Sequence, residues 1–367
     1  MEAALPLSHL KVVELAAQGP GPFAAALLAD FGADVVIIDR PSDDNPGGAE
    51  RRFDTYNRNK RSIALDLKSG VGRKTALSLI EKADVFIEGY RPGVTERLGL
   101  GPDTCLQINP KLIYGRMTGW GQDGPWAQEA GHDINYLALT GALAAMGTPG
   151  TPPPPPLNLV ADLGGGGMYL AFGILAAVME AQRSRKGQVI DCAMVDGVSH
   201  LMSMFQSFRQ QGSWTLDRQS NLVDGGAPFY GTYKTQDDKY VAVGAIEPQF
   251  WRALLQLLDI PPDAMPDQMD KAQWPSMRER ISEAFLELSR DEWINKARGV
   301  DACISPVLTI DEAWEHPQLQ YRETFKKLGG VIQPSPAPRL SRTPGRLRNA
   351  APEPNADAET ILRDWGL

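Results

Sequence analysis

The sequence contains few cysteines and few histidines. Its three cysteines, Cys105, Cys192 and Cys303, are scattered over 367 residues and form no C-x-x-C pair. An odd, sparse set does not build a disulfide framework and is typical of a reducing cytoplasm. With only four histidines, no group of residues has the spacing of a metal site. We therefore expect no disulfide, no metal and no thiol nucleophile.

Long hydrophobic runs and an excess of positive charge are also absent. No stretch of the sequence reads as long and apolar enough to cross a bilayer, and residues 1–6 lack the pattern of a secretion signal. The net charge of −8 argues against binding to nucleic acid. We expect a cytoplasmic protein that binds neither a membrane nor a nucleic acid.

Positive charge nevertheless gathers in one segment. Residues 51–74 carry eight basic side chains against two acidic ones, Asp54 and Asp66. One interpretation is a solvated basic face. The other is a local anion site suited to a phosphorylated small molecule, with Arg58 and Arg61 as candidate phosphate contacts.

The first half of the sequence alternates between strand-like and helix-like runs. The strands are expected at 11–16, 34–39, 62–67, 84–88, 111–117 and 189–193, and the helices at 23–31, 70–82 and about 168–182. Strands separated by helices predict an α/β fold with a Rossmann-like, doubly wound parallel sheet.

The pattern changes after about residue 200. Two strand-like runs, 229–235 and 240–244, flank the turn Asp237-Asp238 and predict a hairpin, and helices follow near 248–258 and 274–288. We therefore expect a smaller α+β domain. The predicted division is a large domain at 1–195 completed by about 325–367, a linker at 196–224, the small domain at 225–310 and a return linker at 311–324.

One motif suggests a nicotinamide-dependent dehydrogenase. Residues 19–24 match G-x-G-x-x-A between a strand and a helix, and Asp39 ends the next strand. However, Pro20 and Pro22 have no N–H group to direct at a pyrophosphate. A dehydrogenase dependent on NAD(P) therefore stays as a remote alternative.

Several segments, in order along the chain, resemble the racemase branch of the class III (CaiB/BaiF-type) CoA-transferase family. They are 13–22, 38–41, 61–68, 88–94, 119–122, 131–136, 156–162, 224–230 and 244–250. The resemblance extends from about residue 7 to about residue 310. It implies a Rossmann-like large domain, a smaller domain and an interlocked homodimer, with each active site shared between the large domain of one subunit and the small domain of the other.

The resemblance also implies roles for individual residues. His132 and Asp162 match the two catalytic bases, and Glu247 matches a residue that orients the histidine across the subunit interface. The CoA part of the substrate would be bound by Arg40, Leu65, Asp66, Leu67, Lys68 and Arg91. The pantetheine and thioester end would be lined by Gly131, Asp133, Ile134, Asn135 and Tyr136. We expect no proton-transfer role for Asp133, and Asp162 also suits the N-cap of the helix that follows it.

The implied activity is the interconversion of (2R)- and (2S)-2-methylacyl-CoA thioesters. One base removes the α-proton on one face, and an acid returns a proton to the other face of the planar enolate. Coenzyme A is part of the substrate, and no separate cofactor is expected. The main alternative is CoA transfer between carboxylates with Asp162 as nucleophile, and a non-catalytic CoA-binding protein is a remote one.

Overall fold

A computed structural model describes residues 4–41 and 50–367, which fall into two compact units. The first unit comprises Met1–Thr140, Pro155–Leu201 and Pro317–Leu367, and the second comprises Gly141–Pro154 and Met202–His316. Residues 1–3, part of the stretch in which no secretion signal is expected, lie outside the described residues.

The first unit is built on a six-stranded sheet. Its strands are β1 (Lys11–Leu15), β2 (Asp34–Asp39), β3 (Arg61–Ala64), β4 (Val85–Glu88), β5 (Ile113–Thr118) and β6 (Gln188–Ala193). Neighbouring strands are all parallel, in the order β3-β2-β1-β4-β5-β6. This is the Rossmann strand order, in which ligands bind beyond the carboxyl ends of the strands where the order reverses. The predicted fold class is confirmed.

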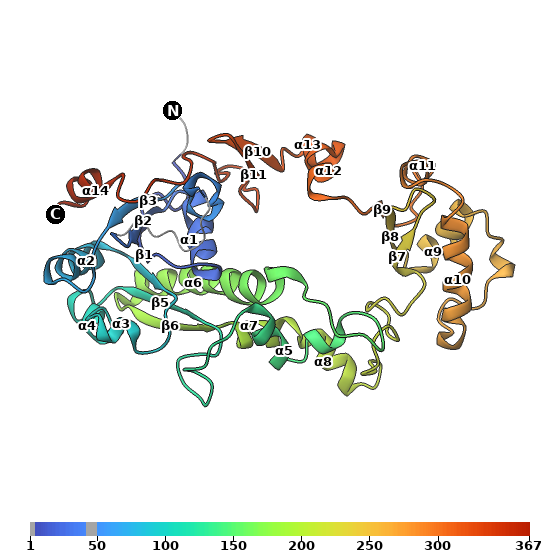
Figure 1. Ribbon diagram of the computed structural model, residues 1–367, viewed down its shortest axis with the longest axis horizontal. Coiled ribbons are helices and arrows are strands. Elements are labelled where there is room, and N and C mark those ends of the chain that lie inside the picture. Colours follow the sequence, from blue (N-terminus) through green and yellow to red (C-terminus); the bar gives the residue numbers. More distant parts are fainter. Residues whose placement is uncertain (1–3, 42–49) are drawn as a thin grey trace. The chain divides into compact units, whose positions relative to one another are not determined.

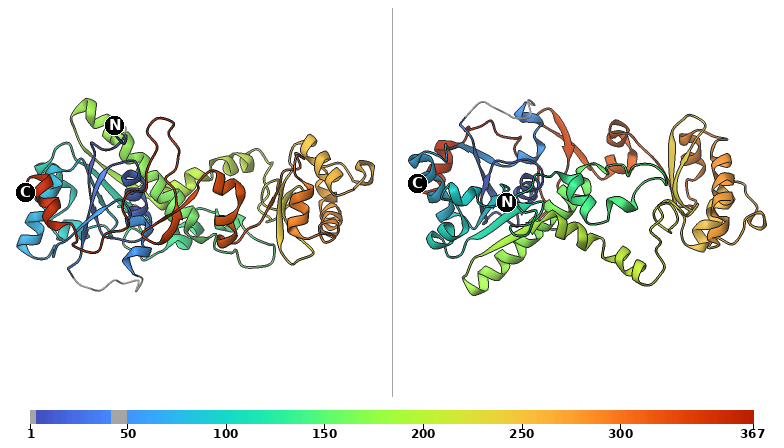
Figure 2. Two further views of the ribbon diagram at one scale, coloured as in Figure 1. Left: turned by 90° about the horizontal axis from the view of Figure 1, so that it is seen from above. Right: turned by 60° about the horizontal axis from the view of Figure 1, so that its bottom comes forward.

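Helices cover both faces of this sheet (Figure 1). Helices α2 (Gly70–Lys82), α4 (Pro102–Ile108) and α14 (Ala358–Trp365) share one core with apolar side chains of β1 to β5. Helices α1 (Pro20–Asp30) and α6 (Tyr169–Ser184) contact β1, β2, β4, β5 and β6 from the other side. Figures 1 and 2 both show α14 lying beside α2, so the end of the chain completes the first unit.

Shorter elements complete the first unit. They are α3 (Val94–Arg97), α5 (Asp133–Leu139), α7 (Met194–Leu201), α13 (Pro317–Tyr321) and the antiparallel pair β10 (Phe325–Leu328) and β11 (Val331–Pro334). Helices α5 and α7 both contact η5 (Val160–Met168). These contacts surround the segment that precedes α6.

One helix corrects an expectation from the sequence. Helical structure extends over Leu157–Ser184 with a kink at Asn158. By length and composition this helix could cross a membrane, alone among the described residues. Its first part includes η5, which is a π-helix rather than a continuation of α6. The helix is built into the first unit, because η5 contacts α1 and α7 and α6 contacts β5 and β6.

The second unit has its own sheet and core. Strands β7 (Tyr230–Lys234), β8 (Tyr240–Gly244) and β9 (Ile304–Pro306) are antiparallel, so the predicted hairpin is confirmed. Its helices are α8 (Ser203–Gln210), α9 (Pro248–Leu257), α10 (Trp274–Phe285), α11 (Arg290–Lys296) and α12 (Ile310–Glu315). Large aromatic side chains, including Phe229, Phe285 and Trp293, fill the core.

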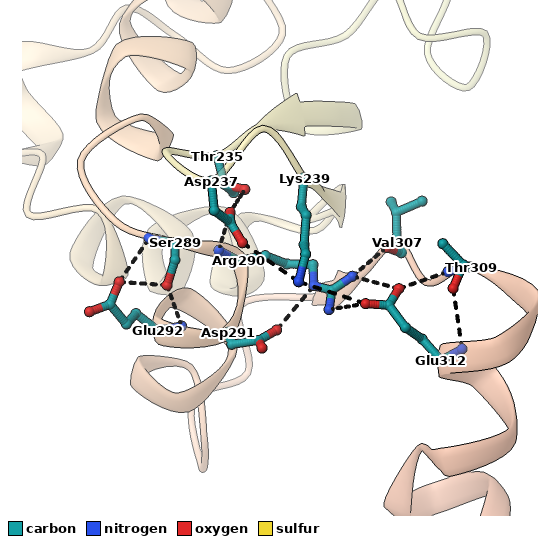
Figure 3. Close-up of polar contacts among 10 residues, drawn as sticks. All are labelled: Thr235, Asp237, Lys239, Ser289, Arg290, Asp291, Glu292, Val307, Thr309 and Glu312. Carbon is teal, nitrogen blue, oxygen red and sulfur yellow. Dashed lines mark hydrogen bonds and ion pairs between the residues drawn. The ribbon is translucent and has the colours of Figure 1, made fainter.

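A buried arginine holds several loops of the second unit together (Figure 3). Arg290 donates to both carboxylate oxygens of Glu312, at 2.8 and 3.0 Å, and to the backbone carbonyl of Val307. Its backbone N–H donates to Asp237, in the turn between β7 and β8. The hydrogen bonds from Arg290 lower the pKa of Glu312 from 4.5 to about 2. Helix α12 is thereby fixed to the sheet of this unit.

Candidate active site

A cavity of about 940 Å³ lies at the carboxyl ends of β1, β2 and β4. Its volume is that of a typical cofactor or ligand site. Arg40, predicted to bind the CoA part, is exposed and lines the cavity. The other lining residues are Glu14, Ala16, Ala17, Gln18, Ile37, Asp39, Pro41, Arg51, Asp54, Asn57, Ala64, Gly89, Tyr90, Glu353, Pro354 and Asn355.

The acid at the end of β2 has its oxygens engaged within the fold. Asp39 accepts from Arg51 at 3.0 and 3.3 Å and from the hydroxyl of Ser62 at 2.5 Å. A dinucleotide site needs this carboxylate for a ribose hydroxyl. Gly19, with φ +78°, precedes Pro20 at the start of α1, so a residue without an N–H group occupies the first helical position. These contacts disfavour the dehydrogenase hypothesis.

Several basic side chains of residues 51–74 form ion pairs within the fold and are not free to bind an anion. Arg58 pairs with Asp30 at 2.7 Å, and Arg61 pairs with Asp34 at 2.6 Å and Asp364 at 3.0 Å. The interpretation of Arg58 and Arg61 as phosphate contacts is therefore wrong.

A third basic residue of this segment is fully buried. Lys60 pairs with Glu14 at 2.7 Å. Burial raises the pKa of Glu14 and lowers that of Lys60.

Of the remaining predicted CoA contacts, Leu65 and Leu67 are partly buried against the core of the first unit, and the others lie on its surface. Leu65 to Lys68 follow β3 directly and form the turn that enters α2. The backbone N–H of Lys68 donates to the carboxylate of Asp66 at 3.0 Å. Asp66, Lys68 and Arg91 are exposed. Two positive side chains are therefore available to a phosphorylated ligand, together with Arg40 in the cavity.

His132 stands at the start of α5 with its backbone fixed. Its N–H donates to the side-chain oxygen of Asn135 at 3.0 Å, and the preceding carbonyl, of Gly131, accepts from the Tyr136 hydroxyl. A Cβ at Gly131 would lie 2.7 Å from the Tyr136 ring and 2.9 Å from Trp120, so only glycine fits. The His132 side chain is exposed, as are Ile134 and Asn135.

Asp162 lies inside η5 rather than at its N-cap. The N-cap residue is Leu159, so the expectation that Asp162 caps the helix is wrong. Its Oδ2 atom accepts from the side-chain amide of Asn158 at 2.8 Å. A Cβ placed on Gly19 would lie 3.4 Å from the same oxygen. The carboxylate therefore faces the start of α1.

The glycine run after Asp162 allows close helix packing. A Cβ on Gly165 would lie 2.8 Å from Val198 of α7, and one on Gly167 would lie 2.6 Å from Phe23 of α1. On the facing side, a Cβ on Gly197 would lie 1.8 Å from the carbonyl oxygen of Gly165. Backbones approach this closely only where neither carries a side chain. The glycines thus fix η5, and with it Asp162, between α1 and α7.

Asp133 joins the two segments that carry the candidate bases. Its Oδ2 atom accepts from the backbone N–H of Ala161 at 3.1 Å and of Asp162 at 2.7 Å. The residue is 5% exposed, and burial raises the pKa of its carboxyl. The start of α5 is thereby bonded to the start of η5.

Glu247 belongs to the second unit. It is exposed and precedes Pro248, the first residue of α9. The thiol of Cys303 is near it, and burial and the negative charge of Glu247 raise the pKa of that thiol. The structure thus places His132 and Asp162 in the first unit and Glu247 in the second.

Two residues at this site were not predicted from the sequence. Asn158 binds the carboxylate of Asp162, and their separation by four positions was a signal that could have identified the pair. Trp120 packs against Tyr136 with ring centroids 4.7 Å apart. The contact of Trp120 with Gly131 depends on tertiary structure and could not be predicted from a local sequence pattern.

Comparison with known proteins identifies the family. A sequence model described as CoA-transferase family III matches residues 7–358. "Alpha-methylacyl-CoA racemase" of Mus musculus is 46% identical, covering 98% of this chain and 93% of the mouse protein. The Homo sapiens protein of the same name is 43% identical, and the match covers 98% of this chain and 94% of the human protein.

A solved structure agrees with this assignment. The crystal structure of a CAIB/BAIF family protein from Brucella suis is 26% identical, with a TM-score of 0.86, and the match covers 99% of this chain and 100% of that one. The family match spans both units and includes His132, Asp162 and Glu247. The chain belongs to CoA-transferase family III.

Proposed function

We propose that this protein is a racemase that interconverts (2R)- and (2S)-2-methylacyl-CoA thioesters. The observation that carries the proposal is the similarity over 98% of the chain to two racemases of that name. The site supports it, because an imidazole and a carboxylate occur on two segments that Asp133 bonds together. Such a pair supplies the two proton-transfer groups that inversion requires.

The reaction moves one proton off the α-carbon and another onto it. For one epimer, Asp162 takes the α-proton, and the electron pair of the C–H bond moves into the thioester to give an enolate. The imidazolium of His132 then donates its proton to the opposite face of the carbon. For the other epimer the two groups exchange roles. General acid–base catalysis of this kind contributes roughly 10²–10⁴-fold.

The coenzyme A part of the substrate occupies the first unit in this proposal. Its phosphates bind Arg40, Lys68 and Arg91, and the turn formed by Leu65, Asp66 and Leu67 lies beside the chain of the ligand. Segment 131–136, which includes Gly131, Asp133, Ile134, Asn135 and Tyr136, borders the thioester. The cavity at β1, β2 and β4 and the exposure of the three cationic side chains support this placement. We propose no separate cofactor.

We further propose that two copies of the chain form a homodimer with shared active sites. Helix α6 and the preceding Met168 present an exposed apolar stripe. Phe172 is 73% exposed and Met179 is 69% exposed, and Met168 and Leu175 are 51% and 36% exposed. A large exposed apolar face on a helix is typical of an interface. Glu247 of a second copy would then orient His132. Free cysteines without a disulfide support a cytoplasmic location.

The reaction is tested with a single epimer of a 2-methylacyl-CoA in D₂O. We expect the opposite epimer to form, with deuterium at the α-carbon. A CoA-transferase would instead move CoA to an added carboxylate, with Asp162 as nucleophile and without α-exchange. Transfer without exchange contradicts the proposal, and CoA binding with neither reaction indicates a non-catalytic protein.

The shared site is tested by co-expressing two impaired variants with different affinity tags. If Asp162→Asn and Glu247→Gln act in the same site from different subunits, a doubly purified hybrid recovers activity at one of its two sites. Each variant purified alone is the control. A hybrid with no more activity than the mean of the two parents contradicts the shared site.

A further inference from the structure

The carboxylate of Asp133 is the most direct non-covalent link between the two candidate bases. Asp133 follows His132 in the chain, and its Oδ2 atom accepts the backbone N–H of Asp162 itself, at 2.7 Å. The neighbouring N–H of Ala161 donates to the same oxygen at 3.1 Å. One oxygen atom thus connects the residue beside one base to the backbone of the other.

The length of this link limits the distance between the bases. One peptide unit, one aspartate side chain and one hydrogen bond place the Cα atoms of His132 and Asp162 within roughly 12 Å of each other. Backbones within this spacing are close enough for an imidazole and a carboxylate to contact the same carbon atom. A change of about 1 Å in such a spacing affects proton transfer strongly.

Each neighbouring contact fixes one end of the link. At the His132 end, Asn135 accepts from the His132 N–H and Tyr136 donates to the Gly131 carbonyl. At the Asp162 end, Asn158 donates to the carboxylate. None of these three contacts crosses between the two segments. Asp133 does so, and it is buried at 5% exposure.

We propose that Asp133 is a positioning residue that sets the spacing of His132 and Asp162 for proton transfer on opposite faces of one α-carbon. The inference rests on the proposed racemase activity. Asp133 itself transfers no proton, since its bonded oxygen faces the backbone of η5. It also occupies the first N–H groups of that helix, so these donors are already paired when substrate binds.

A positioning role has a kinetic signature that a purely structural role lacks. If the spacing is lost, each base still removes the α-proton from the epimer it faces and returns a solvent deuteron to the same face. Exchange with retention then persists while inversion falls. The informative quantity is therefore the ratio of exchange with retention to inversion, measured in D₂O on each epimer.

The test compares three substitutions. Asp133→Asn keeps the size and one acceptor oxygen, so we expect a ratio close to that of the wild type. Asp133→Ala removes the acceptor, and Asp133→Glu keeps the charge but is longer by one methylene. For both we expect inversion to fall by roughly 10²-fold, with a rise in the ratio and a smaller change in KM.

A matched control separates spacing from stability. Asp30 is also a buried carboxylate of the first unit, paired with Arg58 at 2.7 Å, and Asp30→Asn should lower the melting temperature without changing the ratio. An unchanged ratio in folded Asp133→Glu or Asp133→Ala overturns the inference, as does an equal loss of exchange and inversion. A wild-type protein with neither exchange nor inversion overturns the proposed function as well.

Discussion

The two candidate bases differ in how completely the first unit surrounds them. Asp162 is enclosed by its own unit, because Asn158 binds its carboxylate, Gly19 faces it and the glycines of η5 fix its backbone. His132 has a fixed backbone, and its exposed imidazole takes part in a capping box with Asn135 at the start of α5. The carboxylate of Asp162 is therefore surrounded by contacts of its own unit, whereas the imidazole of His132 is exposed and open to a further polar group.

In the proposed mechanism, this difference leaves a role for a further group beside His132. An imidazole that takes and returns a proton must be held in one tautomer and one orientation, usually by a carboxylate. Glu247, at the start of α9, is the residue that we propose for this role. Under the proposal, Glu247 of a second copy orients His132 and leaves Asp162 unaffected.

The largest effect is expected from removing either base. His132→Ala and Asp162→Asn should each reduce inversion by roughly 10²–10⁴-fold. Each variant should still exchange the α-proton of one epimer with retention, and the two variants should differ in which epimer they exchange. Chiral chromatography with mass detection of deuterium checks both. A variant that inverts at the wild-type rate removes that residue from the mechanism.

The packing of η5 should matter for Asp162 more than for His132. Gly197→Ala would place a Cβ 1.8 Å from the Gly165 carbonyl oxygen, and overpacking of this kind costs about 1–3 kcal/mol. We expect Gly197→Ala to have a lower melting temperature and a slower exchange of the α-proton by Asp162. Gly173→Ala is the control, because its Cβ would meet Ile190 at an ordinary 3.5 Å and alanine favours the helix by about 0.5–1 kcal/mol. Equal stability of the two variants contradicts the packing argument.

Removing the proposed partner of His132 should have an intermediate effect. Glu247→Gln should lower kcat by about 10-fold to 100-fold, the usual effect of losing a group that orients a functional histidine, with little change in KM. Exchange by Asp162 should be retained. The neighbouring substitution Cys303→Ala is the control and should leave both constants unchanged. If Glu247→Gln slows α-proton exchange from both epimers equally, the proposal that Glu247 orients His132 and does not affect Asp162 is wrong.

The smallest effect is expected within the second unit. Glu312 has a pKa depressed to about 2 by Arg290, so its ionised form stabilises the fold above pH 4.5, and this contribution is lost as the pH falls towards 2. Glu312→Gln should therefore be less stable than the wild type at pH 7, with a difference that shrinks below about pH 4.5. Denaturant unfolding at several pH values measures it. A difference independent of pH would show that the pair contributes through packing and not through charge.

The fold was largely predictable because it depends on local patterns. Apolar strands separated by helices predict the parallel sheet, and the hairpin around Asp237 is predicted by its turn and flanking strands. The π-helix was not predictable. The glycines after Asp162 serve as contacts with Gly197 and Phe23, and these contacts depend on residues distant in the sequence.

The site was predictable in its residue types but not in its connections. The resemblance to the family predicted His132 and Asp162 as bases, which stays a prediction, and the local sequence suggested a capping role for Asp162 that the structure does not support. The burial of Arg58 against Asp30 could not be predicted either, because a basic side chain has the same local pattern whether it binds a phosphate or an internal carboxylate.

The central claim is that two groups act on opposite faces of one carbon, and early reaction times in D₂O test it most directly. Starting from one fully protiated epimer, a two-base enzyme transfers only solvent-derived deuterium to the product, while the unreacted epimer stays largely protiated. We predict this distribution during the first turnovers. A product epimer that retains the original proton would show that a single group both removes and returns it, which contradicts the account.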